Sequence, residues 1–326
     1  MASPQRPPRP AQHAPGHDGD GRLAPLVAAL SANVLLGAAI VATRYVIPRT
    51  DFLTLALLRY GLGTAFLLPF LAWQRPRLPP RRDLLSLAAL GLLLFGIFPL
   101  TYNAALRHTL ASRAGVLFAL VPLLTMAFAV AIGTERFQRR RLVGGLLALA
   151  GIALALGDPA SLRAAPGVWL GDALMGVTVC LGAAYNVLSR RPLQRQPALT
   201  GVAVSMAAGT LGLGLLRALL ALAGAGGGWP AFTPTDWAVL AFIAIGGASL
   251  GYWLFLWALR HATPTRVAVF VPLNPIVAAA LGALLLGEPA GPGLLLGLAI
   301  VTAGILVVNW NVGAAPHADG APAGRR

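Results

Sequence analysis

Charged residues are scarce in this sequence of 326 residues, and cysteine is nearly absent. Only 11% of the residues are charged, against roughly 25% in an average soluble domain, so most of the chain does not face water. The one cysteine, Cys180, excludes a disulfide within the chain. The signatures of a phosphate-binding loop, a paired-cysteine metal site, a zinc protease and a serine hydrolase are also missing.

The acidic residues are restricted in position as well as in number. All ten fall in tails, in loops or at the ends of apolar stretches. No cluster of carboxylates, histidines or cysteines forms at one depth, as an intramembrane enzyme would need. We therefore expect no catalytic residue, no metal and no cofactor. A carboxylate that could couple the protein to protons is not evident either.

Long apolar stretches are what the sequence has in abundance. Hydrophobic residues make up 57% of the chain, and the mean hydropathy is +0.74. A helix that crosses a bilayer needs about 20 apolar residues. We find ten such stretches, at 25–47, 51–73, 83–104, 111–132, 142–157, 166–188, 198–223, 236–259, 264–286 and 292–310. The prediction is an all-α polytopic membrane protein with ten transmembrane helices, between polar tails at 1–24 and 311–326 that we expect to be disordered.

The basic residues, all of them arginine, give the chain a net charge of +15. If the N-terminus is cytoplasmic, eighteen arginines fall in the tails and the inner connections. Five fall in the outer connections, namely Arg44, Arg49, Arg107, Arg113 and Arg163. This asymmetry follows the positive-inside rule and places both termini in the cytoplasm, with the protein in the plasma (inner) membrane. The charge therefore indicates a lipid bilayer as the partner and does not indicate nucleic acid.

A repeat runs through the chain at an offset of 153 residues. The tetrapeptide ALRH occurs at 105–108 and again at 258–261. The same offset pairs Asn33 with Asn186, Asp83 with Asp236, Arg113 with Arg266, Pro122 with Pro275 and Glu135 with Glu288. Residues 25–157 and 166–310 each hold five of the ten stretches, and an odd number makes the second copy enter the membrane from the opposite side. We therefore predict two inverted five-helix repeats, an arrangement typical of secondary transporters.

The second half of each repeat resembles a known family. The stretches beginning NAALRHTLASRAGVLFALVP and LWALRHATPTRVAVFVPLNP share a short loop and a proline in mid-helix, followed by a glutamate and a glycine-studded helix. This order is similar to that of EamA-type transporters of the drug/metabolite transporter superfamily. The resemblance spans about residues 25–310 and implies a ten-helix, two-repeat fold. Substrates in that superfamily include amino acids, sugars and drugs, so the resemblance implies a small-molecule substrate without naming one.

The matched prolines, Pro122 and Pro275, are the first candidates for a substrate site. Proline removes a helical hydrogen bond and bends the helix, and interruptions at matched positions of two halves indicate a transport site. Thr125 and Asn274 lie beside them. An ordinary packing kink is the alternative. For Glu135 and Glu288, which each close a proline-containing stretch, we favour a structural role at a helix end over proton relay.

Arg59 is the one clear charge placed deep in a predicted span. It lies eight residues into the stretch 51–73, or about 12 Å at 1.5 Å per residue. A charge at such depth is costly and usually faces the interior of the bundle. It either attracts an anionic group of the substrate or bonds to carbonyls that are freed at kinks near Pro99 and Pro122, and the sequence leaves both readings open.

Other polar and aromatic residues fall at similar depth. These are Asn33, Tyr60, Tyr102, Asn103, Phe118, Tyr185, Asn186, Tyr252 and Trp253. Amides in lipid need partners and should point inward. We expect about half of the set to line a substrate cavity and the rest to hold helices together.

These observations predict a transporter of small metabolites or drugs. We expect a secondary transporter that acts as an exporter and works by alternating access between the two repeats. The alternative is a flippase for a lipid or a lipid-linked sugar on the same fold.

Overall fold

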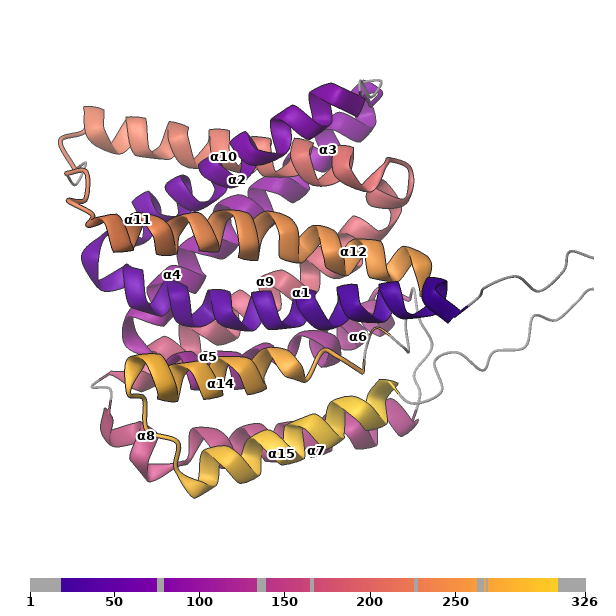
Figure 1. The fold of residues 1–326 in the computed structure, drawn as a ribbon, viewed down its shortest axis with the longest axis vertical. Coiled ribbons are helices and arrows are strands. Elements are labelled where there is room, and N and C mark those ends of the chain that lie inside the picture. Colours follow the sequence, from indigo (N-terminus) through magenta and orange to yellow (C-terminus); the bar gives the residue numbers. More distant parts are fainter. Residues whose placement is uncertain are drawn as a thin grey trace, which may run out of the picture.

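The computed structural model describes residues 19–309 except 75–78, 134–138, 165–166, 226–227, 263–266 and 268. These residues form helices and no strand. Figure 1 shows the helices lying side by side in one bundle. The first half contains α1 (Gly19–Val46), η1 (Ile47–Arg49), α2 (Phe52–Gln74), α3 (Arg81–Gly91), η2 (Leu92–Ile97), α4 (Phe98–His108), α5 (Ala111–Phe118), α6 (Val121–Ala131) and α7 (Arg139–Leu156). The short α8 (Pro159–Ala164) leads to α9 (Val168–Gln194), α10 (Ala198–Leu222), α11 (Pro234–Ala241), η3 (Phe242–Gly251), α12 (Tyr252–His261), α14 (Leu273–Leu286) and α15 (Pro292–Asn309).

The predicted apolar stretches coincide with helices. Within the described residues, seven helical segments are long and apolar enough to cross a membrane, and three more apolar helices are shorter. The shorter ones are Val143–Leu156, Leu273–Leu286 and Pro292–Val307. The helix α1 begins at Gly19, so part of the segment expected as a polar tail is helical. Residues 1–18 and 310–326, together with Glu135 and Arg266, lie outside the described residues.

Several helices are irregular at matching places in the two halves. The π-helical segments η2 and η3 join α3 to α4 and α11 to α12, and residues 92–97 plus 153 fall inside η3. The helix α5 ends at Phe118 and α6 begins at Val121, directly before Pro122. In the second half, turns at 269–272 precede α14, which contains Pro275. The interruptions expected at the two prolines are therefore present as breaks between helices.

Reciprocal glycine contacts join α7 to α15. A methyl group added at Gly151 would lie 2.7 Å from the carbonyl oxygen of Gly297, and one added at Gly304 would lie 2.7 Å from that of Gly144. Gly297 and Gly304 are the counterparts of Gly144 and Gly151 at the offset of 153. Because the residue numbers rise along α7 as they fall along α15, these two equivalent helices run antiparallel. They lie together at the lower edge of Figure 1.

The equivalent helices α2 and α10 also meet. The hydroxyls of Thr64 and Thr210 share a hydrogen bond of 3.2 Å. An offset of 146 residues relates these two helices, since it takes Phe52 to Ala198 as well as Thr64 to Thr210. A residue of the first half therefore bonds to its own counterpart in the second.

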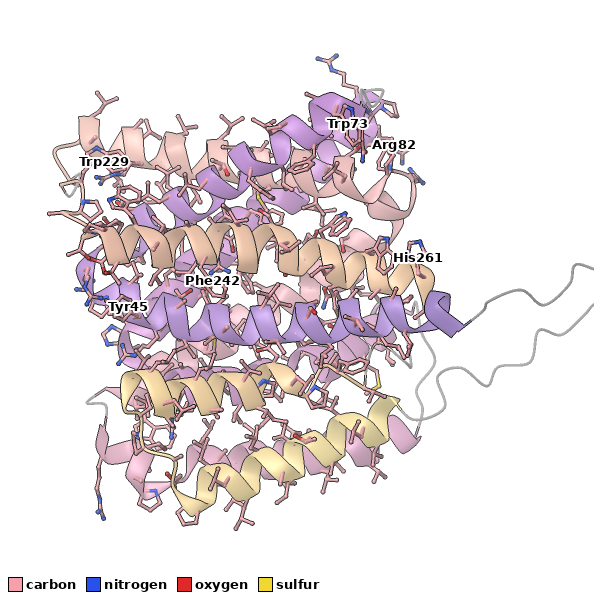
Figure 2. All side chains as sticks on the ribbon, in the orientation of Figure 1. Tyr45, Trp73, Arg82, Trp229, Phe242 and His261 are labelled. Atoms are coloured by element: carbon pink, nitrogen blue, oxygen red, sulfur yellow. The ribbon has the colours of Figure 1, made fainter. Side chains whose placement is uncertain are left out.

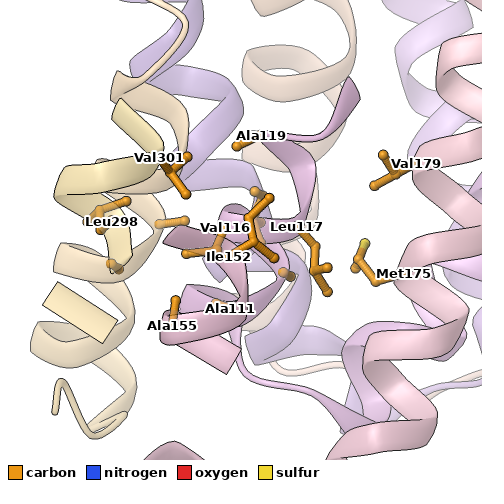
Figure 3. Close-up of a cluster of buried hydrophobic side chains, with 14 of the residues drawn as sticks. Ala111, Val116, Leu117, Ala119, Ile152, Ala155, Met175, Val179, Leu298 and Val301 are labelled. Atoms are coloured by element: carbon orange, nitrogen blue, oxygen red, sulfur yellow. The ribbon is translucent and has the colours of Figure 1, made fainter. Parts of the chain in front are cut away.

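The largest apolar cluster also draws on both halves. It includes Val116 of α5 and Ile152 of α7 from the first half, and Met175 of α9 and Val301 of α15 from the second (Figure 3). All four side chains are at most 5% exposed. Burial of apolar surface thus holds the two halves together at this place.

The bundle has two distinct ends. Figure 2 shows Tyr45 and Trp229 at one end, and Trp73, Arg82 and His261 at the other. We call these the Tyr45 end and the Arg82 end. The beginning of α1 and the end of α15 both lie at the Arg82 end (Figure 1).

Candidate functional site

Six aromatic rings from five helical segments form two neighbouring groups of ring contacts, which Arg59 joins through Tyr60 and Tyr102. Phe98 contacts Tyr102 and Phe118, and Tyr102 also contacts Phe118, with ring centres 5.8–6.2 Å apart. Phe95 contacts Tyr60 at 5.3 Å and Tyr252 at 6.5 Å. We call this set of six the aromatic cluster.

Arg59 lies against the aromatic cluster. Its guanidinium carbon is 5.3 Å from the ring centre of Tyr60 and 5.8 Å from that of Tyr102, distances at which a cation is attracted to an aromatic face. Arg59 donates a long hydrogen bond of 3.4 Å from Nη1 to the hydroxyl of Thr43. Its side chain is 7% exposed, and Nε is buried without a hydrogen-bond partner. Among the described residues, Arg59 forms no hydrogen bond with the carbonyls near Pro99 and Pro122 that were considered as its partners.

The structure brings five of the predicted site residues into contact with this region. Arg59, Tyr60, Tyr102, Phe118 and Tyr252 form part of the group just described. Tyr185 of α9 belongs to the same apolar cluster as Tyr60 and Phe95. Pro122 and Pro275 stand at the helix breaks described above.

The four predicted asparagines are not among the residues that contact Arg59 or the aromatic cluster in the ways just described. The Asn33 side chain donates to the carbonyl of Ala29 in its own helix, and Asn103 donates to the carbonyl of Phe52. Asn186 donates to Thr125 at 3.3 Å, which links α9 to α6. The Asn274 side-chain oxygen is buried without a partner. Trp253 is 43% exposed and is not part of the apolar clusters found among the described residues.

Sequence reasoning missed Phe95, Phe98 and Thr43. Phe98 and Tyr102 are four residues apart in α4 and so share one helical face, a spacing that was readable from the sequence. The place of Phe95 was not readable, because it lies in the π-helical segment η2, where the ordinary helical period does not hold.

Apart from Arg59 and Asp83, the buried charges among the described residues lie at the Tyr45 end. Arg113, which is fully buried, forms an ion pair with Asp172 and also donates to the carbonyl of Leu156 and the hydroxyl of Ser161, both at 2.8 Å. Asp172 also accepts a hydrogen bond of 2.7 Å from Thr109. This network joins α5 of the first half to α9 of the second.

Glu288 has a structural place, as expected, although its partners were not foreseen. Its carboxylate accepts hydrogen bonds from the backbone N–H of Ala111 at 2.8 Å and of Ser112 at 3.1 Å. It therefore caps the first turn of α5, where a negative charge is favourable. With Arg44, Tyr45 and Arg49 it also lines a cavity of about 510 Å³ that opens at the Tyr45 end.

Among the described residues, an ion pair between an exposed arginine and a largely buried aspartate lies at each end, and the repeat relates the two pairs. Arg49 contacts Asp236 at 3.4 Å at the Tyr45 end, and Arg195 contacts Asp83 at 3.3 Å at the Arg82 end. Asp83 and Asp236 are related by the offset of 153, and Arg49 and Arg195 by the offset of 146 that relates α2 to α10. Each pair links a connection in one half to a helix of the other.

Comparisons with known proteins agree with this duplicated helical bundle. Residues 23–157 and 169–310 each match the model of the EamA-like transporter family. A protein of Escherichia coli K12, described as the uncharacterized inner membrane transporter YedA, is 25% identical over 294 residues, which are 88% of this chain and 92% of the relative. An Archaeoglobus fulgidus protein, described as an uncharacterized transporter, is 27% identical over 230 residues, covering 70% of this chain and 78% of the relative.

A crystal structure of another protein shows the same fold. It superposes with a TM-score of 0.63 at 19% identity, covering 87% of this chain and 95% of the other. The resemblance noted in the sequence is confirmed by the two family matches, and the duplication of the domain with it.

Proposed function

Since this chain belongs to the EamA-like transporter family, we propose that it is a secondary transporter that exports small metabolites with an anionic or zwitterionic group. Arg59 and the aromatic cluster form the proposed binding site. Pro122 and Pro275 stand at the helix breaks that would move with it, and Tyr185 would line its walls. The surrounding helices would be supported by Asn33, Asn103, Thr125, Asn186 and Asn274.

This proposal rests on the burial of Arg59 and on the absence of a hydrogen-bond partner for its Nε. A buried guanidinium with an unpartnered Nε is costly unless an anion reaches it. Its planar fork suits a carboxylate or a phosphate, which it can bind with two parallel hydrogen bonds. The rings of Tyr60 and Tyr102 lie 5.3 and 5.8 Å from the guanidinium and carry no full negative charge, so they do not neutralise it. A substrate anion would supply the missing partner.

Alternating access between inverted repeats is the proposed mechanism. The antiparallel contact of α7 with α15 supports the inversion, because the first is the last helix of one repeat and the second is its equivalent. The two equivalent ion pairs support the alternation, since each joins the two halves at one end, where its loss would favour opening of that end. Following the distribution of arginines, we place the Arg82 end and both termini in the cytoplasm.

A transport measurement tests the proposed function. Liposomes that contain the purified protein and are loaded with a carboxylate-bearing metabolite are expected to release it faster than protein-free liposomes with the same load. No lipid-linked donor is present in either sample. The same vesicles with a fluorescent lipid serve as the control for lipid flipping. Movement of the lipid without movement of any soluble anion would refute the proposal.

Single cysteines test the orientation and the ion pairs together. Thr54 and Thr200 are equivalent residues near the two ends, at most 1% exposed, and each can be changed to cysteine in a Cys180→Ser background. An impermeant maleimide added to intact cells should react with the cysteine at 54 and not with that at 200. Reaction at 200 from outside would reverse the orientation.

The ion pairs should shift these reactivities in opposite directions. Exposed pairs contribute roughly 0.2–1 kcal/mol, so Arg49→Gln should raise labelling at position 54 by up to about fivefold and lower it at position 200. Arg195→Gln, the matched change at the other end, should do the reverse. Labelling at position 200 is measured in inverted membrane vesicles, in which the cytoplasmic side of the membrane faces the added maleimide. If each substitution raised labelling at both positions, the pairs would stabilise the fold without controlling access.

A further inference from the structure

A second cationic site lies away from the aromatic cluster, at the Tyr45 end of α10. A cavity of about 460 Å³ is lined by Arg217, Trp229 and Leu57, and by the small residues Gly214, Ala218, Ala221 and Gly224. The guanidinium carbon of Arg217 is 5.6 Å from the ring centre of Trp229. The lining contains one positive charge and no acidic residue, so its charge suits an anion.

The surroundings of the cavity are apolar and exposed. Leu211, Leu215 and Leu219 on α10 are 73%, 62% and 54% exposed, which is the expected state of side chains that face lipid. Gly214, Ala218 and Ala221 follow one another at helical spacing on α10 and leave a strip without bulky side chains. An acyl chain fits such a strip better than a polar solute does.

The depth of Arg217 matches a lipid headgroup. It lies five residues before the end of α10 at Leu222, or about 7.5 Å along the helix axis. Trp229, which is 68% exposed, is of the type that sits at membrane–water interfaces. A phosphate in the headgroup layer would therefore lie level with the guanidinium, beside the tryptophan.

We propose that this cavity binds an anionic phospholipid of the leaflet at the Tyr45 end. Arg217 contacts the phosphate, Trp229 covers the glycerol region, and one acyl chain lies along the strip of small residues. The cavity is lined from α2, α10 and the connection that follows α10, whereas Arg59 contacts α1 and α4. The site is thus separate from the proposed substrate site and does not depend on it.

Lipid retention in native mass spectrometry tests this proposal. Wild-type protein is released from micelles that contain equal amounts of phosphatidylglycerol and phosphatidylcholine, and the bound lipid is identified by mass. We expect a preference for phosphatidylglycerol that falls about fivefold in Arg217→Gln. Arg163→Gln, which removes an exposed arginine of α8 from the same end, is the matched control and should keep the preference.

Two further measurements distinguish a lipid phosphate from free inorganic phosphate and test the role of the strip of small residues on α10. Inorganic phosphate at millimolar concentration should not displace the lipid, because it lacks the acyl chain. Ala218→Leu should reduce retention of both lipids while Arg217 keeps its charge. The proposal is wrong if Arg217→Gln retains phosphatidylglycerol as the wild type does, if the wild type shows no preference, or if inorganic phosphate alone displaces the lipid.

Discussion

Replacing Arg113 with methionine is expected to lower the free energy of unfolding by about 3–5 kcal/mol, because the carboxylate of Asp172 would remain buried without its cation. Asp172 is only 7% exposed and Arg113 is fully buried. The carbonyl of Leu156 and the hydroxyl of Ser161 would lose a donor in the same variant. Thermal unfolding of the purified protein in detergent measures the loss.

A double variant separates the ion pair from general damage to the core. Arg113→Met combined with Asp172→Leu removes both charges, so it should recover most of the lost stability, because buried pairs are often replaceable by apolar residues. Arg163→Gln is the control for loss of an exposed arginine, and it should stay within about 0.5 kcal/mol of the wild type. A double variant as unstable as Arg113→Met alone would contradict the assignment.

Changing Arg59 to glutamine should raise the apparent KM for the transported anion by about ten- to a hundredfold, the effect of losing a charged hydrogen bond of roughly 1.5–3 kcal/mol. Arg59→Lys keeps the charge and loses the planar fork, so its KM should lie between those of the wild type and of Arg59→Gln. The melting temperature should behave differently. Since the guanidinium has an unpartnered Nε in the absence of substrate, its removal should leave the melting temperature unchanged or raise it.

Two controls make the Arg59 result specific. A neutral ester or amide of the same substrate should show the same KM in the wild type and in Arg59→Gln. Thr43→Val removes the long hydrogen bond to Nη1 but leaves the charge, so it should change KM much less. A KM that stays constant while the melting temperature falls in both Arg59 variants would assign Arg59 to the structure of the bundle.

The helices were largely predictable because hydropathy and length alone define an apolar segment. The stretch expected at 51–73 is the helix Phe52–Gln74, and the interruptions at the two prolines follow from their missing N–H groups. The clustering of Tyr60, Tyr102 and Phe118 with Arg59 follows from their shared depth. Neither the short α8 nor the extension of α1 to Gly19 was foreseen.

Partners distant in the sequence were not predictable. Glu288 was expected to have a structural role, but its donors lie in α5, 176 and 177 residues away: two backbone N–H groups and the hydroxyl of Ser112. Every residue but proline carries a backbone N–H group, so the sequence does not single these donors out. Trp253 was grouped with the site residues by depth, yet it is 43% exposed. It follows η3, where each π-helical turn adds a residue, so a period of 3.6 residues counted through η3 does not give the face on which it lies.

The reciprocal glycine contacts of α7 and α15 have a consequence for each half alone. A surface on which Gly144 meets the counterpart of Gly151, and Gly151 the counterpart of Gly144, is complementary to itself, as in an isologous dimer. A gene for one half would therefore encode a chain that can pair with a second copy of itself, provided that the copies insert in opposite directions. Joining both halves in one chain removes the need for such dual insertion. Under the proposed inversion each half is then free to hold one direction, and the arginines at 136 and 139–141, which the second half lacks after Glu288, are the difference that such a divergence would leave.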